Sequence, residues 1–189
     1  MVLTRQKWVD ESPLARREMD APRTGPGEVR VKVSVCAVCR TDIHIVEGDL
    51  ALHKMPVIPG HQIVGRVDET GDSVTRLRVG QRIGIAWLRH VDGTCQFCRR
   101  GRENLCRDSR YTGYDADGGY AEYAVVPEDF AYELPEGLDD EHVSPFAVRW
   151  IDRLPRAPAG RGAGEGSAAA GRLRQLGAHR HPDRVAPRA

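Results

Sequence analysis

The stretch EVRVKVSVCAVCRTDIH, residues 28–44, joins an alternating apolar segment to a group of side chains that can bind a metal. In its first part, a valine stands at every second position and a polar residue stands between each pair of valines. This alternation predicts a half-buried β-strand over residues 28–36. A thiol, a hydroxyl, a carboxylate and an imidazole then follow within six residues, from Cys39 to His44. The stretch therefore predicts a strand that delivers chemically active side chains to its end.

Three further strands are expected, at residues 63–67, 82–87 and 120–126. Clusters of Gly, Pro and Asp separate them, and such clusters are typical of turns. Short strands without long amphipathic helices between them favour a mainly β fold, built as a mostly antiparallel barrel or sandwich.

The overall composition limits the possible partners. The 189 residues suffice for one substantial domain, and 28 Lys and Arg residues oppose 27 Asp and Glu residues, for a net charge of +1. This balance provides no electrostatic attraction to nucleic acid or to an anionic membrane, so a small molecule is the expected partner.

The five cysteines are expected to remain reduced. No apolar run approaches the roughly 20 residues that span a bilayer, and the first residues do not form a signal peptide, so we expect a cytoplasmic protein. Thiols in that compartment serve as metal ligands or core residues more often than as disulfides.

The first candidate metal site combines Cys39 with His61, which stands in the block GHQIVG at residues 60–65. Thiolate and imidazole are ligands that zinc prefers. Taken singly, each has a simpler interpretation, because a Cys after a strand is usually a core residue and a His after a turn is usually a hydrogen-bonded surface residue.

Together, CxTDxH and GHxxxG at this separation resemble the zinc-dependent medium-chain alcohol dehydrogenases. The resemblance continues through GPGEVRVKVSVC, the VEGD turn, VGQRIG and GGYAEY, and it covers residues 1–145. It implies the GroES-like catalytic domain of that family: a mainly β, antiparallel barrel-type fold with short helices and a zinc-binding lobe.

The resemblance also implies a catalytic zinc held by Cys39, His61 and one further Cys, with a fourth position open to an alcohol oxygen. Zinc would act as a Lewis acid that lowers the pKa of the alcohol. The family usually has Glu after the metal-binding His, whereas this chain has Gln62, which removes a negative charge near the metal.

Further roles follow from the resemblance for the residues around Cys39. Thr41 would hydrogen-bond the substrate oxygen and pass its proton toward His44, Asp42 would support a zinc-bound His, and Arg40 would contact the cofactor pyrophosphate. Without the neighbouring motif, Thr41 and Asp42 would be read as turn or helix-cap residues and Arg40 as a solvated charge.

The second candidate metal site lies in DGTCQFCRRGRENLC, residues 92–106. The family has four cysteines at this spacing around a structural zinc, and here Asp92 stands in the first position. A carboxylate oxygen is a known zinc ligand, so a site with three thiolates and one carboxylate is chemically reasonable. An iron–sulfur cluster or a redox-active cysteine pair are the alternatives. The expected ligands are Asp92, Cys95, Cys98 and Cys106.

Residues 146–189 are expected to form a tail outside the family pattern, either disordered or produced by a shift of reading frame. No cysteine follows Cys106, and the glycines at 162–166 follow no hydrophobic strand, so we reject them as a dinucleotide-binding loop. We therefore expect no Rossmann domain in this chain and no turnover by the chain alone.

Three functions remain open at this point. By resemblance, the chain is a truncated zinc-dependent oxidoreductase of small alcohols or aldehydes that uses NAD or NADP and whose full-length relatives can form homo-oligomers. The alternative is a stand-alone zinc-binding structural or interaction module without catalysis. A zinc-free quinone reductase relative is disfavoured, because that branch lacks these Cys and His ligands.

Overall fold

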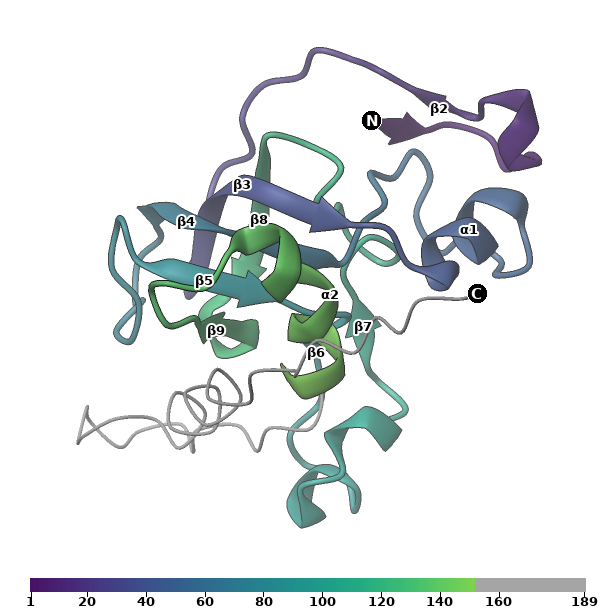
Figure 1. Cartoon of the computed structure of the whole chain (residues 1–189). Helices are drawn as coiled ribbons and strands as arrows, with labels where there is room; N and C mark the ends of the chain where they lie inside the picture. The colour runs from purple at the N-terminus through teal and green to yellow at the C-terminus, as the bar shows by residue number, and fades with distance from the viewer. Residues whose placement is uncertain (152–189) are drawn as a thin grey trace, which may run out of the picture.

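The computed structural model describes residues 1–151 and shows a curled sheet with a short helix at one end and a second helix against one face (Figure 1). Within these residues, no helix is long and apolar enough to cross a membrane.

A five-stranded antiparallel sheet forms the centre of the fold, in the order β8-β3-β4-β5-β9. No ladder joins its outer strands to each other within the described residues, so the sheet curls without closing. The expected mainly β, antiparallel barrel-type fold is confirmed. The strands are β3 (Glu28–Ala37), β4 (Gln62–Thr70), β5 (Arg82–Ile85), β8 (Tyr123–Pro127) and β9 (Ala131–Glu133).

Two of the predicted strands are shorter than expected. The strand predicted from residue 82 to 87 ends at Ile85, and the carbonyl of Trp87 instead accepts a hydrogen bond from the amide of Thr112. The strand predicted from residue 120 begins at Tyr123. The amides of residues 118–120 are not available to that strand, because they bond the turn at residues 58–60.

Smaller elements surround the sheet. Helix α1 (Arg40–Glu47) follows β3 directly, and helix α2 (Asp140–Ile151) packs against β3, β4 and β5. Two-stranded ladders join β1 (Val2–Leu3) to β2 (Leu14–Ala15) and β6 (Leu88–His90) to β7 (Arg110–Tyr111). Single 3-10 turns cover Val9–Glu11, Cys98–Arg100, Glu103–Leu105 and Glu128–Phe130.

The start of α1 is fixed by a capping box formed by Cys39 and Asp42. The Asp42 carboxylate accepts the amide of Cys39 at 2.9 Å, and the Cys39 sulfur accepts the amide of Thr41 at 3.4 Å. Gly48, with φ at 98°, ends the helix in the left-handed conformation that glycine adopts most easily. The motif around Cys39 therefore builds the helix that carries it.

Helix α2 is tied to the strand ends that border the first candidate site. The fully buried hydroxyl of Ser144 accepts the amide of Ala37 at 3.0 Å and donates to the carbonyl of Gln62. At the start of the helix, the buried guanidinium of Arg82 bonds Asp140 and two backbone carbonyls. The helix runs across residue 145, where we expected the family pattern to end, and the expectation for residues 152–189 lies outside the described part of the chain.

The core lies on the inner face of the curled sheet. Alternate residues of β3 enter it, as predicted: Val29 and Val31 are fully buried, whereas Lys32 and Ser34 are exposed. Each buried Val or Ile side chain contributes about 1.5–3 kcal/mol to folding through removal of apolar surface from water. Contacts of this kind make the sheet a rigid support for the loops at its ends.

Candidate metal centres

The first centre brings together Cys39, Asp42 and His61 at the junction of β3, α1 and β4. One ligand atom from each of these residues lies within 4.8 Å of the others. His61 and Asp42 are each only 2% exposed. Residues 19 positions apart in the sequence thus meet in one buried cluster.

The Asp42 carboxylate is the hub of this cluster. Its Oδ1 accepts the Gly60 amide at 3.2 Å and lies 3.1 Å from Nδ1 of His61, while its Oδ2 accepts the Cys39 amide. The bond to Nδ1 fixes the orientation of the imidazole and leaves Nε2 as the nitrogen that faces away from the carboxylate. Because Oδ1 binds Nδ1 of His61 and Oδ2 binds the Cys39 amide, Asp42 is well placed to orient the His.

The chemistry of this centre fits a zinc ion. Zinc prefers thiolate and imidazole ligands in a tetrahedral arrangement, and a ligand atom of Cys39 lies within 4.8 Å of one of His61. Beside them, the hydroxyl of Tyr120 is buried and has no hydrogen-bond partner among the residues that the structure describes. Burial raises the pKa of Tyr120, and the nearby Asp42 carboxylate raises it further. An unsatisfied polar atom at this position is consistent with a site that accepts a polar ligand.

Cys36 is close to this centre but differs from Cys39 in character. Its sulfur packs against Gly60 and Gly119, and burial raises the pKa of the thiol to about 12. The thiol therefore stays protonated at neutral pH and fills space. Sequence reasoning assigned no role to it, and the structure places it as a packing residue behind Gly60.

The other residues expected around Cys39 lie on α1. Thr41 is half-buried on the first turn beside the Cys39 sulfur, and Arg40 is exposed. His44 lies one turn further along, and its Nδ1 is 2.6 Å from Oδ2 of Asp49. This pairing orients the imidazole of His44, and the sequence analysis did not anticipate it.

Two aromatic residues, Trp87 and Tyr111, lie beside His61. The sequence analysis gave neither of them a role. The indole of Trp87 meets the imidazole of His61 edge to face, with ring centroids 4.8 Å apart. On its other side Trp87 stacks on Tyr111 at 4.7 Å, with an interplanar angle of 19°. A stacked pair of aromatic rings therefore lies next to His61, and the pairing of β6 with β7 brings these rings together.

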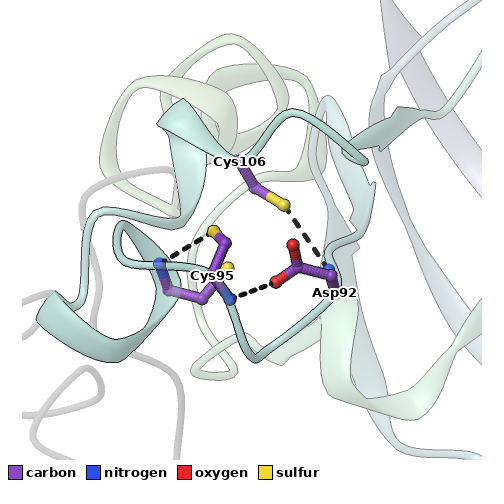
Figure 2. Close-up of side chains that lie close together, drawn as sticks. Asp92, Cys95 and Cys106 are labelled. Atoms are coloured by element: carbon purple, nitrogen blue, oxygen red, sulfur yellow. Dashed lines mark hydrogen bonds between the residues drawn. The ribbon is translucent and has the colours of Figure 1, made fainter.

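The second centre is a loop that gathers all four of the expected residues, Asp92, Cys95, Cys98 and Cys106. Figure 2 shows Asp92, Cys95 and Cys106 turned toward one another. A ligand atom of each lies within 4.8 Å of the others. The Cys106 sulfur accepts the amide of Asp92 and the Cys95 sulfur accepts the amide of Cys98, both at 3.5 Å. Hydrogen bonds from backbone amides to the sulfurs orient the thiols toward the centre of the group.

Asp92 occupies the position where the family resemblance leads us to expect a fourth thiolate. Its Oδ1 accepts the amides of Thr94 at 2.7 Å and of Cys95 at 2.9 Å, and these bonds lower the pKa of the carboxyl. The side chain is thus held ionised and pointed toward the sulfurs, as Figure 2 shows. Three sulfurs and one carboxylate oxygen make a donor set that zinc accepts in a closed tetrahedral site.

Electrostatics in the lobe favour a bound cation. Burial, together with hydrogen bonds to Cys95, Asp92 and Cys106, raises the pKa of Cys98 to about 12. A divalent cation among these groups would reverse the effect, since it stabilises the thiolate form. Few apolar side chains support the lobe, so a metal would provide much of the energy that orders it.

Comparisons with known proteins agree with this geometry. Residues 25–136 match the sequence pattern of the alcohol dehydrogenase GroES-like domain. A protein described as a probable alcohol dehydrogenase of Mycobacterium tuberculosis is 52% identical over 148 residues, and an alcohol dehydrogenase of Geobacillus stearothermophilus is 42% identical over 137 residues. These alignments cover 76% and 72% of this chain.

A solved structure supports the same comparison. The cobalt- and zinc-bound thermostable alcohol dehydrogenase of Pyrobaculum aerophilum superposes with a TM-score of 0.67 at 32% identity, over 73% of this chain and 41% of that chain. The chain spans less than half the length of the curated relatives it matches, 43% of the Mycobacterium protein and 41% of the Geobacillus protein.

Proposed function

The chain belongs to the family defined by the alcohol dehydrogenase GroES-like domain, and from this premise we propose that it carries the metal-binding catalytic part of a zinc-dependent oxidoreductase. The proposed reaction interconverts small alcohols and aldehydes with NAD or NADP as the hydride carrier. The observation that carries the proposal is the buried cluster in which Asp42 orients His61 next to Cys39.

In this proposal Cys39 and Nε2 of His61 hold a zinc ion. A zinc ion bound there would supply a Lewis acid that polarises the substrate oxygen. Asp42 keeps Nδ1 of His61 engaged and the ring in position, while the Trp87 indole excludes water from one side. Both contributions come from groups that are already in place before any substrate binds.

Proton transfer is assigned to α1. Thr41 can donate and accept a hydrogen bond at its hydroxyl, so it can hold the substrate oxygen and pass on the proton. His44 lies one turn away, is partly exposed, and can exchange that proton with solvent, with Asp49 holding its Nδ1. Arg40, exposed at the start of the helix, is available to a cofactor pyrophosphate.

The lobe with Asp92 is proposed to hold a second, structural zinc. All four donors come from one loop. Four protein ligands fill the coordination positions of a tetrahedral zinc, so no position is left for a substrate. Its role would be to order residues 92–106. An iron–sulfur cluster held by thiolates or a redox-active cysteine pair would give Asp92 no role as a ligand.

A stand-alone zinc-binding module is the second candidate, and one observation favours it. Among residues 1–151, the first centre contains only one thiol and one imidazole that are placed as ligands, since Asp42 is placed to orient the His. With a single well-formed closed site, the chain would be a zinc-stabilised structural unit without catalysis.

The two candidates are separated by testing for an open coordination position. The 189-residue chain is loaded with one equivalent of zinc to fill the lobe, and Co²⁺ is then added as a visible probe of the first centre. A catalytic centre predicts Co²⁺ absorption bands that are lost in His61→Gln and that change when a primary alcohol is added. Co²⁺ absorption bands that do not change when the alcohol is added support the stand-alone module.

Small alcohols or aldehydes are the proposed substrates, and the proposal includes a cytoplasmic location and homo-oligomers of the full-length protein. Nucleic acid and membrane surfaces are not proposed as partners, in line with the net charge of +1. Analytical ultracentrifugation of a protein that contains this domain and has the length of its relatives tests the assembly. Fractionation of the source cells tests the location.

A further inference from the structure

The turn Ile58–Pro59–Gly60, which leads directly into His61, is bound by a second loop far away in the sequence. The carbonyls of its three residues each accept an amide from consecutive residues of that loop. Gly118 bonds Ile58 at 2.7 Å, Tyr120 bonds Pro59 at 3.0 Å, and Gly119 bonds Gly60 at 2.8 Å.

The amides of the turn are bound as completely as its carbonyls. The amide of Ile58 donates to Oδ1 of Asp117 at 3.0 Å, and the amide of Gly60 donates to Asp42. Proline has no amide, so every backbone polar group of the turn has a partner. Four of these five partners lie in residues 117–120, and the fifth is the carboxylate that also orients His61.

Backbone contact between the two loops leaves no room for side chains. A Cβ atom added to Gly118 would stand 2.0 Å from the Gly60 oxygen, which is far inside any real contact. Gly60 itself has φ at 97°, and a Cβ there would lie 2.6 Å from the Tyr120 ring. The turn and residues 118–120 are thus packed backbone against backbone, with no space for a side chain at Gly118 or Gly60.

We propose that residues 117–120 are the positioning element of His61 in the candidate catalytic metal centre. The hydrogen bonds that residues 117–120 make with the turn reach neither the His61 imidazole, which Asp42 orients, nor the Cys39 sulfur. Through these bonds they act on the turn that presents the His. The inference rests on the proposed function of that centre. A loop with a merely structural role would stabilise the fold without affecting how the centre binds a metal.

The test compares two glycine variants of the full chain, Gly118→Ala and Gly71→Ala. An alanine Cβ at either position would stand 2.0 Å from the carbonyl oxygen of another glycine, Gly60 in the first case and Gly25 in the second. The two changes are therefore matched in steric cost, but only the first acts on the turn before His61. Both variants receive one equivalent of zinc for the lobe before Co²⁺ is titrated into the first centre.

We expect Gly118→Ala to weaken Co²⁺ binding at the first centre by about 10–100-fold, the range typical of changes behind a metal ligand. Gly71→Ala should change it by less than about threefold, since distant sites act independently. A second readout uses zinc alone, without Co²⁺, and follows the ¹⁵N NMR signals of the His61 imidazole. Added zinc should shift these signals in the wild type and in Gly71→Ala. At the same zinc concentration it should not shift them in Gly118→Ala.

A milder set of variants decides the question if Gly118→Ala does not fold. Asp117→Ala removes the acceptor of the Ile58 amide, whereas Asp117→Asn can keep it through its side-chain oxygen. Lys54→Ala removes only the ion pair that the other carboxylate oxygen makes with Lys54. We expect Asp117→Ala to weaken Co²⁺ binding at least about fivefold, and Asp117→Asn and Lys54→Ala to bind as the wild type does.

The outcomes separate the two levels of the proposal. If the wild type shows no Co²⁺ site that depends on His61, the metal centre and the positioning role are both wrong. If the wild type binds Co²⁺ there, and both Asp117→Ala and any folded Gly118→Ala bind it equally well, the metal centre stands and the positioning role is overturned.

Discussion

Replacing Asp42 with Ala should be among the most damaging single changes in the described part of the chain. The side chain is 3% exposed and accepts three hydrogen bonds, from the amides of Cys39 and Gly60 and from Nδ1 of His61. The Gly60 and His61 donors are buried, and each buried donor left without a partner costs about 1–3 kcal/mol. The Cys39 amide is only partly buried and can reach water. We therefore expect Asp42→Ala to lower the free energy of unfolding by about 4 kcal/mol.

Two control variants show how much of this loss in the free energy of unfolding comes from the buried hydrogen bonds of Asp42. Asp42→Asn keeps an acceptor for the two buried donors and loses only the bond to Cys39, so we expect a loss of about 1 kcal/mol. Asp49→Ala removes the same charge from the other end of α1, where it forms an exposed pair with His44, and should cost at most about 1 kcal/mol.

Urea unfolding followed by far-UV circular dichroism, with one equivalent of zinc present, measures all three free energies. The reasoning is refuted if Asp42→Ala and Asp49→Ala differ by less than about 1 kcal/mol, because the buried carboxylate would then not organise the centre.

Three other perturbations have definite expected outcomes. Cys98→Ser should release the tightly held zinc and lower the melting temperature, as read by metal analysis and calorimetry; a variant that keeps both contradicts the structural role of the lobe. Cys36 has its pKa raised from 9.0 to about 12 by burial, so the unfolded chain ionises first and stability should fall as pH rises from about 9 toward 12. Cys36→Ala should flatten that part of the stability profile, and an unchanged profile would place its cause elsewhere. Arg82→Met should destabilise the chain by about 3 kcal/mol, because Asp140 and two carbonyls lose their partner; a loss below about 1 kcal/mol in urea unfolding would show that α2 is held by other contacts.

The parts of the fold that were predictable from the sequence are those with local signals. Alternation of valines identified β3 because one face of a sheet strand is buried and the other is not. The spacing of Asp92, Cys95, Cys98 and Cys106 identified the lobe because one short loop supplies all four side chains. Cys39 and His61 were paired through the family resemblance, and the structure brings them together.

The remaining features depend on contacts between distant segments and left no local signal. Trp87 reads as the end of an apolar run, and only the fold places its ring against His61. The sequence predicts Tyr120 to lie in a strand. In the structure its amide donates to the carbonyl of Pro59, and its ring lies against Gly60. Ser144 gave no signal at all, although its hydroxyl links α2 to the ends of β3 and β4.

Metal analysis of the purified 189-residue chain, before and after dialysis against a mild chelator, tests the central claim most directly. The account predicts that about one zinc per chain survives the chelator, held by Asp92 and the three lobe cysteines, and that a second zinc, bound through Cys39 and His61, is lost. A chain that retains two zincs equally, or that binds none in either centre, would contradict the account.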